Sequence, residues 1–126
     1  MPLLTITSFA NWLTERAAFL HSLEDEAAHV LYEDMDKDKY NALMRHKAMF
    51  IHSLPEEAGK RLTHLPEAIA SEASRRLEAF AASAERALAL NSTFYMSALL
   101  YPDDHVKGQP NNLDILAADI ASRARE

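Results

Sequence analysis

A shortage of glycine restricts the fold of this chain more than any other sequence feature. Only Gly59 and Gly108 occur among its 126 residues. β-Sandwiches and β-barrels need many tight turns whose geometry commonly requires glycine, so we exclude these folds. Loops that cradle phosphate need clustered glycines, and because these two lie far apart in the chain we also exclude P-loop and dinucleotide-binding sites. Abundant alanine and scarce β-branched residues favour helices instead.

Apolar residues recur at helical spacing in the first half of the chain, which predicts two amphipathic helices. The first is capped by Thr7 or Ser8 and ends in the polar turn at residues 34–38. The second either kinks or restarts near Pro55, because proline lacks the amide hydrogen that a helix interior requires. We place the turn that follows it at residues 65–67. The two apolar stripes consist of Phe9, Leu13, Leu20, Leu23 and Ala27, and of Tyr40, Leu43, Phe50 and Leu54.

The second half predicts a long helix and a short one. Residues 67–100 keep helical spacing without glycine or proline, and Pro102 prevents continuation. Asn111 or Asn112 caps the last helix. Because short connections make neighbouring helices antiparallel, we predict an all-α fold. It is a single domain over residues 1–126, an antiparallel up-and-down bundle of three long helices plus a short C-terminal helix.

Charge and composition limit the classes of partner and compartment. Thirteen Lys and Arg oppose nineteen Asp and Glu, for a formal net charge of −6. An acidic chain repels the phosphate backbone of nucleic acids. No cysteine is present, which excludes disulfides and cysteine-based zinc sites. No run approaches the ~18 apolar residues that span a bilayer, and the first residues lack a signal-peptide pattern. We therefore expect a cytoplasmic protein that binds neither nucleic acid nor membrane.

Two sets of residues have spacings known from metal-binding helical bundles, and both sets are incomplete. Glu26 and His29 form a Glu-x-x-His pair, but di-iron bundles need a second pair and two more glutamates. His52 and Glu56, considered with His21, lack the His-x-x-x-His pair of hemerythrins. No Gly-x-Ser-x-Gly frame for a nucleophile is present either. We therefore interpret His29 as solvent-exposed and expect no catalytic site, cofactor or metal.

Polar residues on or beside the apolar stripes allow two readings each. Asn91 lies on the stripe of the longest predicted helix, and we favour a buried amide that fixes helix register over one that hydrogen-bonds a partner or ligand. Lys47 interrupts the second stripe, and we expect its stem to lie on apolar surface while the ammonium reaches water. The acidic run at residues 24–26 is interpreted as a solvated helix face.

A dense apolar and aromatic cluster lies between residues 94 and 101 and covers more than one helical face. One face must pack on the bundle, and the remainder is either covered by the terminal helix or exposed to a partner. We favour core packing, and both readings stay open. The cluster consists of Phe94, Tyr95, Met96, Leu99, Leu100 and Tyr101.

The chain resembles the flagellar export chaperones of the FlgN type. Leu20, Leu23, Glu26 and Leu31, the acidic turn at Asp36, and then Tyr40, Leu43, Lys47, Ala48, Ile51 and Leu54 carry the resemblance in the first half. The segment 88–91 is similar to part of the family's third helix, and Tyr101 and Gly108 are similar to its closing Tyr and Gly. The resemblance implies a small cytoplasmic chaperone without a cofactor. Such a chaperone holds the terminal helix of a filament-junction subunit before export and uses its own C-terminal part to do so.

The leading hypothesis is therefore a non-enzymatic protein-interaction module that buries a partner's amphipathic helix against an apolar face. The expected partner-binding residues are Tyr95, Leu99, Leu113, Leu116 and Ile120. One alternative is a small metal- or ligand-binding bundle, with or without enzymatic activity. Another is a structural bundle that forms a homodimer through its third helix.

Overall fold

The computed structural model describes residues 2–102, 104–106 and 108–125, without the side chains of residues 2–4. Five helices account for most of this part of the chain, and it contains no strand, so the predicted all-α class is confirmed. The helices are α1 (Pro2–Tyr32), α2 (Lys37–Leu62), α3 (Glu67–Ala89), α4 (Thr93–Ala98) and α5 (Asn112–Arg123).

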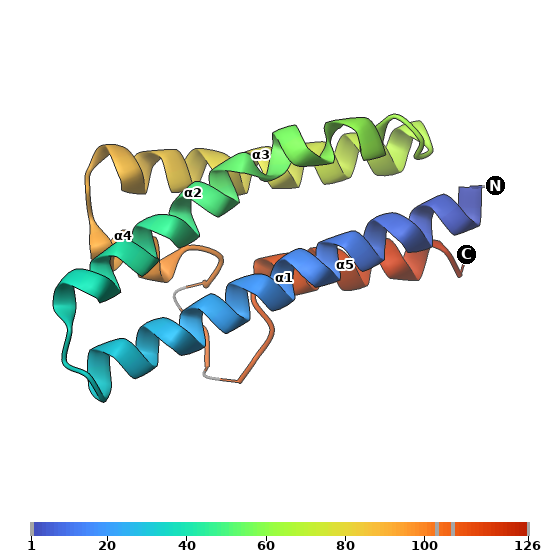
Figure 1. Ribbon diagram of the computed structural model, residues 1–126. Coiled ribbons are helices and arrows are strands. Elements are labelled where there is room, and N and C mark those ends of the chain that lie inside the picture. The colour runs from blue at the N-terminus through green and yellow to red at the C-terminus, as the bar shows by residue number, and fades with distance from the viewer. Residues whose placement is uncertain (1, 103, 107, 126) are drawn as a thin grey trace.

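The four longer helices pack around one core in a closed order (Figure 1). α2 lies against both α1 and α3, and α5 returns to pack along α1 and also touches α3. Within the described residues α1 and α3 do not pack on each other, because α2 and α5 separate them. α5 is therefore a full member of the helical core, whereas the sequence assigned it no fixed position.

Core packing follows the predicted apolar stripes. Leu13 and Leu54 are fully buried within the stripes of α1 and α2, and Leu77 is fully buried on α3. Burying each such side chain contributes about 1.5–3 kcal/mol relative to exposure. The stripe of α5 completes the core with Leu113, Leu116 and Ile120.

The start of α1 differs from the prediction. The helix begins at Pro2, so Thr7 and Ser8 lie inside it and do not cap it. Proline is well suited to the first turn of a helix. Ile6 and Phe9 are buried in the core, so tertiary packing favours helix on both sides of the proposed caps.

α2 is continuous through Pro55. The side chain of Ser53 does not cap a new helix, since its Oγ donates to the carbonyl of Phe50 at 2.7 Å. Leu54 and Ala58 are fully buried on either side of the proline, and their packing keeps the helix intact despite the missing amide hydrogen. The turn at residues 65–67 is confirmed, with Pro66 immediately before α3.

The predicted helix over residues 67–100 is two helices, because α3 ends at Ala89. Asn91 has a φ of 51°, and the amide of Ser92 donates to the carbonyl of Ala87 at 3.1 Å. This is the left-handed termination that glycine and asparagine permit at helix ends. Asn91 is exposed, so the prediction that it is a buried register residue is wrong.

The start of α5 agrees with the sequence. The Asn111 side chain accepts from the amide of Asp114 at 2.8 Å, and the Asp114 carboxylate accepts from the amide of Asn111 at 2.9 Å. This reciprocal capping box satisfies two otherwise unpaired amides. Across the described residues, none of the helices combines the length and apolar character needed to traverse a bilayer.

Candidate functional site

An open groove lies between the C-terminal half of α3 and the segment formed by α4 and Tyr101. Its volume is about 450 Å³, which falls within the range of roughly 300–1,000 Å³ typical of ligand sites. One wall comes from α3, and the other from α4 and the residues after it. The lining side chains are Phe80, Ser83, Arg86, Ala87, Leu90, Tyr95, Ala98, Leu99, Leu100, Tyr101 and Asn112.

Exposed apolar side chains lie in and beside this groove. Leu90 is 66% exposed, Phe94 75% and Tyr95 54%. The Phe94 and Tyr95 rings meet edge to face with their centroids 5.6 Å apart. Contiguous exposed apolar surface of this kind marks interaction sites more often than scattered single residues do.

Of the charged side chains, only Arg86 lines the groove among the described residues. Its Nη2 donates to Ser83 Oγ at 3.2 Å, a neutral acceptor within the same wall. A guanidinium beside apolar surface is suited to a partner carboxylate, which it can bind through two parallel hydrogen bonds.

The five predicted partner-binding residues do not share one surface. Tyr95 and Leu99 both line the groove, although Leu99 is mostly buried. Leu113, Leu116 and Ile120 are fully buried in the core on α5, which packs along α1. These three side chains are therefore inaccessible in this structure, and their proposed contact with a partner stays a prediction that requires α5 to leave α1.

Part of the apolar cluster over residues 94–101 packs in the core, and part of it is exposed to solvent. Met96, Leu99 and Leu100 are buried in the core, whereas Phe94 and Tyr95 are exposed. Tyr101 belongs to neither group, because its ring lines the groove while its hydroxyl reaches a polar network beneath it.

Lys47 is at the centre of this network and is only 1% exposed. Its Nζ donates to Glu24 Oε2 at 2.9 Å and to the carbonyl of Ser97 at 2.9 Å. The same nitrogen lies 5.0 Å from the centroid of the Tyr101 ring. The prediction that the Lys47 ammonium reaches water is therefore wrong, because α1 and the end of α4 cover it with an acidic partner and a carbonyl.

Glu24 connects Lys47 to the segment that follows α4. Its Oε1 accepts from the Tyr101 hydroxyl at 2.7 Å and lies 3.6 Å from His21 Nδ1. The opposite nitrogen of His21, Nε2, lies 2.8 Å from Asp114 Oδ2. The network therefore joins α1, α2, α4, α5 and Tyr101. Glu24 is not the solvated residue that the acidic run predicted.

Burial shifts the pKa of two members of the network. Desolvation lowers the pKa of Lys47 below its ordinary 10.5, and the neighbouring Glu24 carboxylate opposes that shift. Desolvation raises the pKa of Tyr101 well above 10.0, and its hydrogen bond to Glu24 adds to the shift because the carboxylate disfavours a phenolate. The arrangement therefore holds a protonated phenol beside an enclosed lysine side chain that is paired with a carboxylate.

The residues considered for metal binding are dispersed. Glu26, His29, His52 and Glu56 are all exposed, so the interpretation of His29 as solvent-exposed is confirmed. His21 pairs with Asp114. In the part of the chain that the structure describes, no three or more His, Asp or Glu side chains form a group that could hold a metal ion.

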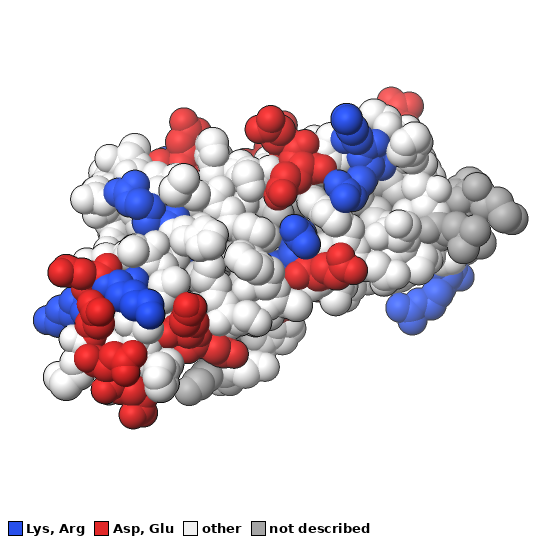
Figure 2. All heavy atoms as spheres, viewed as in Figure 1, with Lys and Arg blue, Asp and Glu red and all other residues white. Residues whose placement is uncertain are grey.

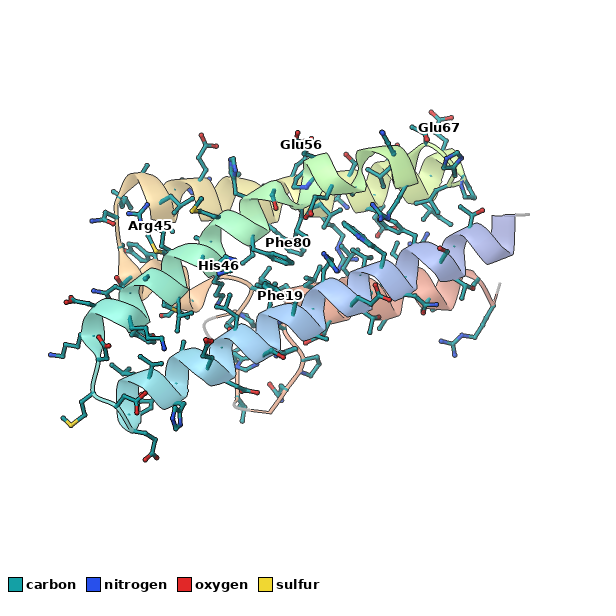
Figure 3. All side chains as sticks on the ribbon, in the orientation of Figure 1. Phe19, Arg45, His46, Glu56, Glu67 and Phe80 are labelled. Atoms are coloured by element: carbon teal, nitrogen blue, oxygen red, sulfur yellow. The ribbon has the colours of Figure 1, made fainter. Side chains whose placement is uncertain are left out.

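An aromatic seam closes the space between α1 and α2. Phe19 stacks on Phe50 with ring centroids 4.6 Å apart. The rings of Phe19 and His46 meet edge to face with their centroids 5.9 Å apart (Figure 3). This seam stabilises the α1–α2 pair.

Charged side chains of both signs gather at the end of the molecule that carries the α1–α2 turn (Figure 2).

Sequence reasoning missed Glu24 and Tyr101 as neighbours of Lys47 and missed Asp114 as the partner of His21. One signal was present, since Lys47 interrupts an apolar stripe and a buried lysine requires an acid nearby. The acid lies 23 positions away along the chain, and no local spacing rule connects the two residues.

No protein-family model matches this sequence, and no curated protein or solved structure shows a significant match to it.

Proposed function

We propose that this protein is a non-enzymatic interaction module that binds an amphipathic helix of a partner protein in the groove between α3 and α4. The observation that carries the proposal is the continuity of the open groove with the exposed Leu90, Phe94 and Tyr95 side chains. Helix-in-groove binding places apolar anchors from successive turns of one helix into such a site.

Charge complementarity specifies the partner helix further. Because Arg86 is the charged side chain that lines the groove in the described residues, we propose an acidic residue beside the apolar face of the helix. Elsewhere the chain is acidic, with a formal net charge of −6. The remaining charge of the partner helix is therefore expected to be neutral or basic.

The resemblance to FlgN-type chaperones supports a more specific form of the proposal. In this form the protein is a cytoplasmic export chaperone, its frame is an up-and-down bundle, and its partner is the terminal helix of a flagellar filament-junction subunit. The segment 88–91, which carries part of the resemblance, contributes Leu90 to the groove. Tyr95 and Leu99 are then the binding residues, and α5 serves as part of the frame.

The test is a titration with a synthetic peptide of such a terminal helix, followed by fluorescence anisotropy. Leu90→Asp and Tyr95→Ala should each weaken binding at least about tenfold, as expected for central interface side chains. Tyr32→Ala is the matched control, because Tyr32 is an exposed tyrosine on α1, away from the groove. Binding that is equally strong in all four proteins would overturn the groove as the site.

A photo-crosslinker at position 95 tests the broader proposal without assuming the flagellar partner. Crosslinked segments identified by mass spectrometry should share an amphipathic helical pattern and an acidic residue beside its apolar face. The matched control carries the crosslinker at position 32. Crosslinks that are the same at both positions, or that lack this pattern, would contradict the proposal.

A further inference from the structure

The residues from Ser97 to Tyr101, here called the strap, form one wall of the groove. Ala98, Leu99, Leu100 and Tyr101 all line it. Leu99 and Leu100 are each only 7% exposed, so most of their apolar surface is turned away from any occupant of the groove. The strap therefore conceals apolar surface directly beside the candidate binding site.

The backbone of the strap is strained. Leu100 has a φ of 73°, and a residue with a bulky side chain disfavours this left-handed region because its Cβ crowds the backbone. Such a conformation persists only where surrounding contacts over-determine it. The strap is thus a segment that relaxes when its anchors are removed.

Three anchors hold the strained segment. Lys47 Nζ donates to the Ser97 carbonyl at its start, and the Tyr101 hydroxyl donates to Glu24 at its end. Between them, the Leu100 carbonyl accepts from the amide of Asn112 at 2.8 Å. The first two anchors meet, because Lys47 and Glu24 pair directly at 2.9 Å.

Lys47 is buried and Glu24 is only 19% exposed, and an ion pair so largely removed from water is an unexpected choice if stability alone is required. Replacing such a pair with apolar residues is often neutral or stabilising. The pair here bonds to both ends of one strained segment. Both ends of the strap therefore depend on the same ion pair.

We infer that Lys47, Glu24 and Tyr101 form a latch that keeps the strap closed, and that release of the latch opens the groove to the partner helix. Opening relieves the strain at Leu100 and adds Leu99 and Leu100 to the apolar surface that the partner contacts. Because only open molecules bind, the apparent affinity for the partner helix is the affinity of the open form multiplied by the fraction of molecules that are open.

Hydrogen exchange of the protein without any partner tests the latch. Tyr101→Phe keeps the ring and removes only the hydroxyl that bonds to Glu24. Exchange of the Leu99, Tyr101 and Asn112 amides should accelerate about tenfold, the loss expected for a hydrogen bond to a charged group. Amides in α3 should keep their wild-type rates, and Tyr95→Phe, which changes an exposed tyrosine of α4, should behave as wild type.

A second variant, Lys47→Met, removes the other anchor and keeps a side chain of similar length. It should accelerate the same amides. Unchanged rates in both variants would overturn the latch. Equal acceleration of the strap and of α3 would also overturn it, because the strap then opens only when the whole molecule unfolds.

The effect on the partner rests on the proposed function and is measured separately. The synthetic terminal-helix peptide should bind the Tyr101→Phe variant severalfold more tightly than it binds the wild-type protein. Faster exchange with unchanged affinity would overturn the coupling between latch and groove. Faster exchange with no binding by either protein would leave the latch in place and contradict the proposed function.

Discussion

The contribution of Lys47 to the stability of the protein depends on the groups that surround its side chain. Its ammonium is buried and makes two hydrogen bonds. Lys47→Ala removes these bonds and leaves a cavity, and we expect it to lower the free energy of unfolding by about 2–4 kcal/mol. Lys47→Met fills the same space, so the loss should be within about 1.5 kcal/mol. Urea denaturation measures both values.

The control for this comparison is Lys60→Ala, since Lys60 is an exposed lysine on the same helix. Surface substitutions of this kind change stability by less than about 0.5 kcal/mol. If Lys47→Ala costs no more than Lys60→Ala, the ammonium is not buried as the structure places it.

From the environment of Tyr101 we predict that the protein loses stability at alkaline pH. The pKa of Tyr101 is raised in the folded state, so the folded protein keeps the phenol proton at pH values where the unfolded chain loses it. The stabilisation is complete below about pH 10, the ordinary pKa of tyrosine, and is lost as pH rises above that value. Wild type should therefore lose urea resistance more steeply above pH 10 than Tyr101→Phe does. Parallel curves for the two proteins would show that the phenol titrates alike in both states.

At the scale of helices, Asn91 determines where α3 ends. Its φ of 51° suits asparagine or glycine and strains an alanine. We expect Asn91→Ala to destabilise the protein by about 1 kcal/mol more than Asn91→Gly. Both variants lose the hydrogen bond that the Asn91 side chain accepts from Arg45, so the difference isolates the backbone. Thermal unfolding measures it, and equal values would contradict a role for the left-handed conformation.

The helices themselves follow from the sequence more reliably than their ends do. The spacing of residues such as Leu13 and Leu77 predicts which faces are buried, because a helical period repeats locally. Helical spacing does not predict where α1 starts, that α2 continues through Pro55, or where α3 ends. Each depends on contacts with other helices or on a backbone angle that asparagine permits but does not require.

At the scale of the whole molecule, the position of α5 decides which predicted site residues are accessible. Its apolar face was predicted correctly, but periodicity does not say whether such a face meets the same chain or a partner. The structure packs it on α1, whereas Tyr95 remains exposed beside the groove. For the same reason the sequence did not reveal the network around Lys47, whose members come from α1, α2, α4, α5 and the residues that follow α4.

Two neighbouring residues on α5 test this position directly. Leu116 is fully buried and Ile115 is 40% exposed, yet both are apolar residues of the same size in the same helical turn. If α5 is a constant part of the core, Leu116→Ala should lower the free energy of unfolding by about 2–4 kcal/mol, and Ile115→Ala by less than about 1 kcal/mol. If α5 instead leaves α1 for much of the time, the two substitutions will have similar small effects. The second result would return Leu113, Leu116 and Ile120 to the accessible surface, and with them the predicted contact between this helix and a partner.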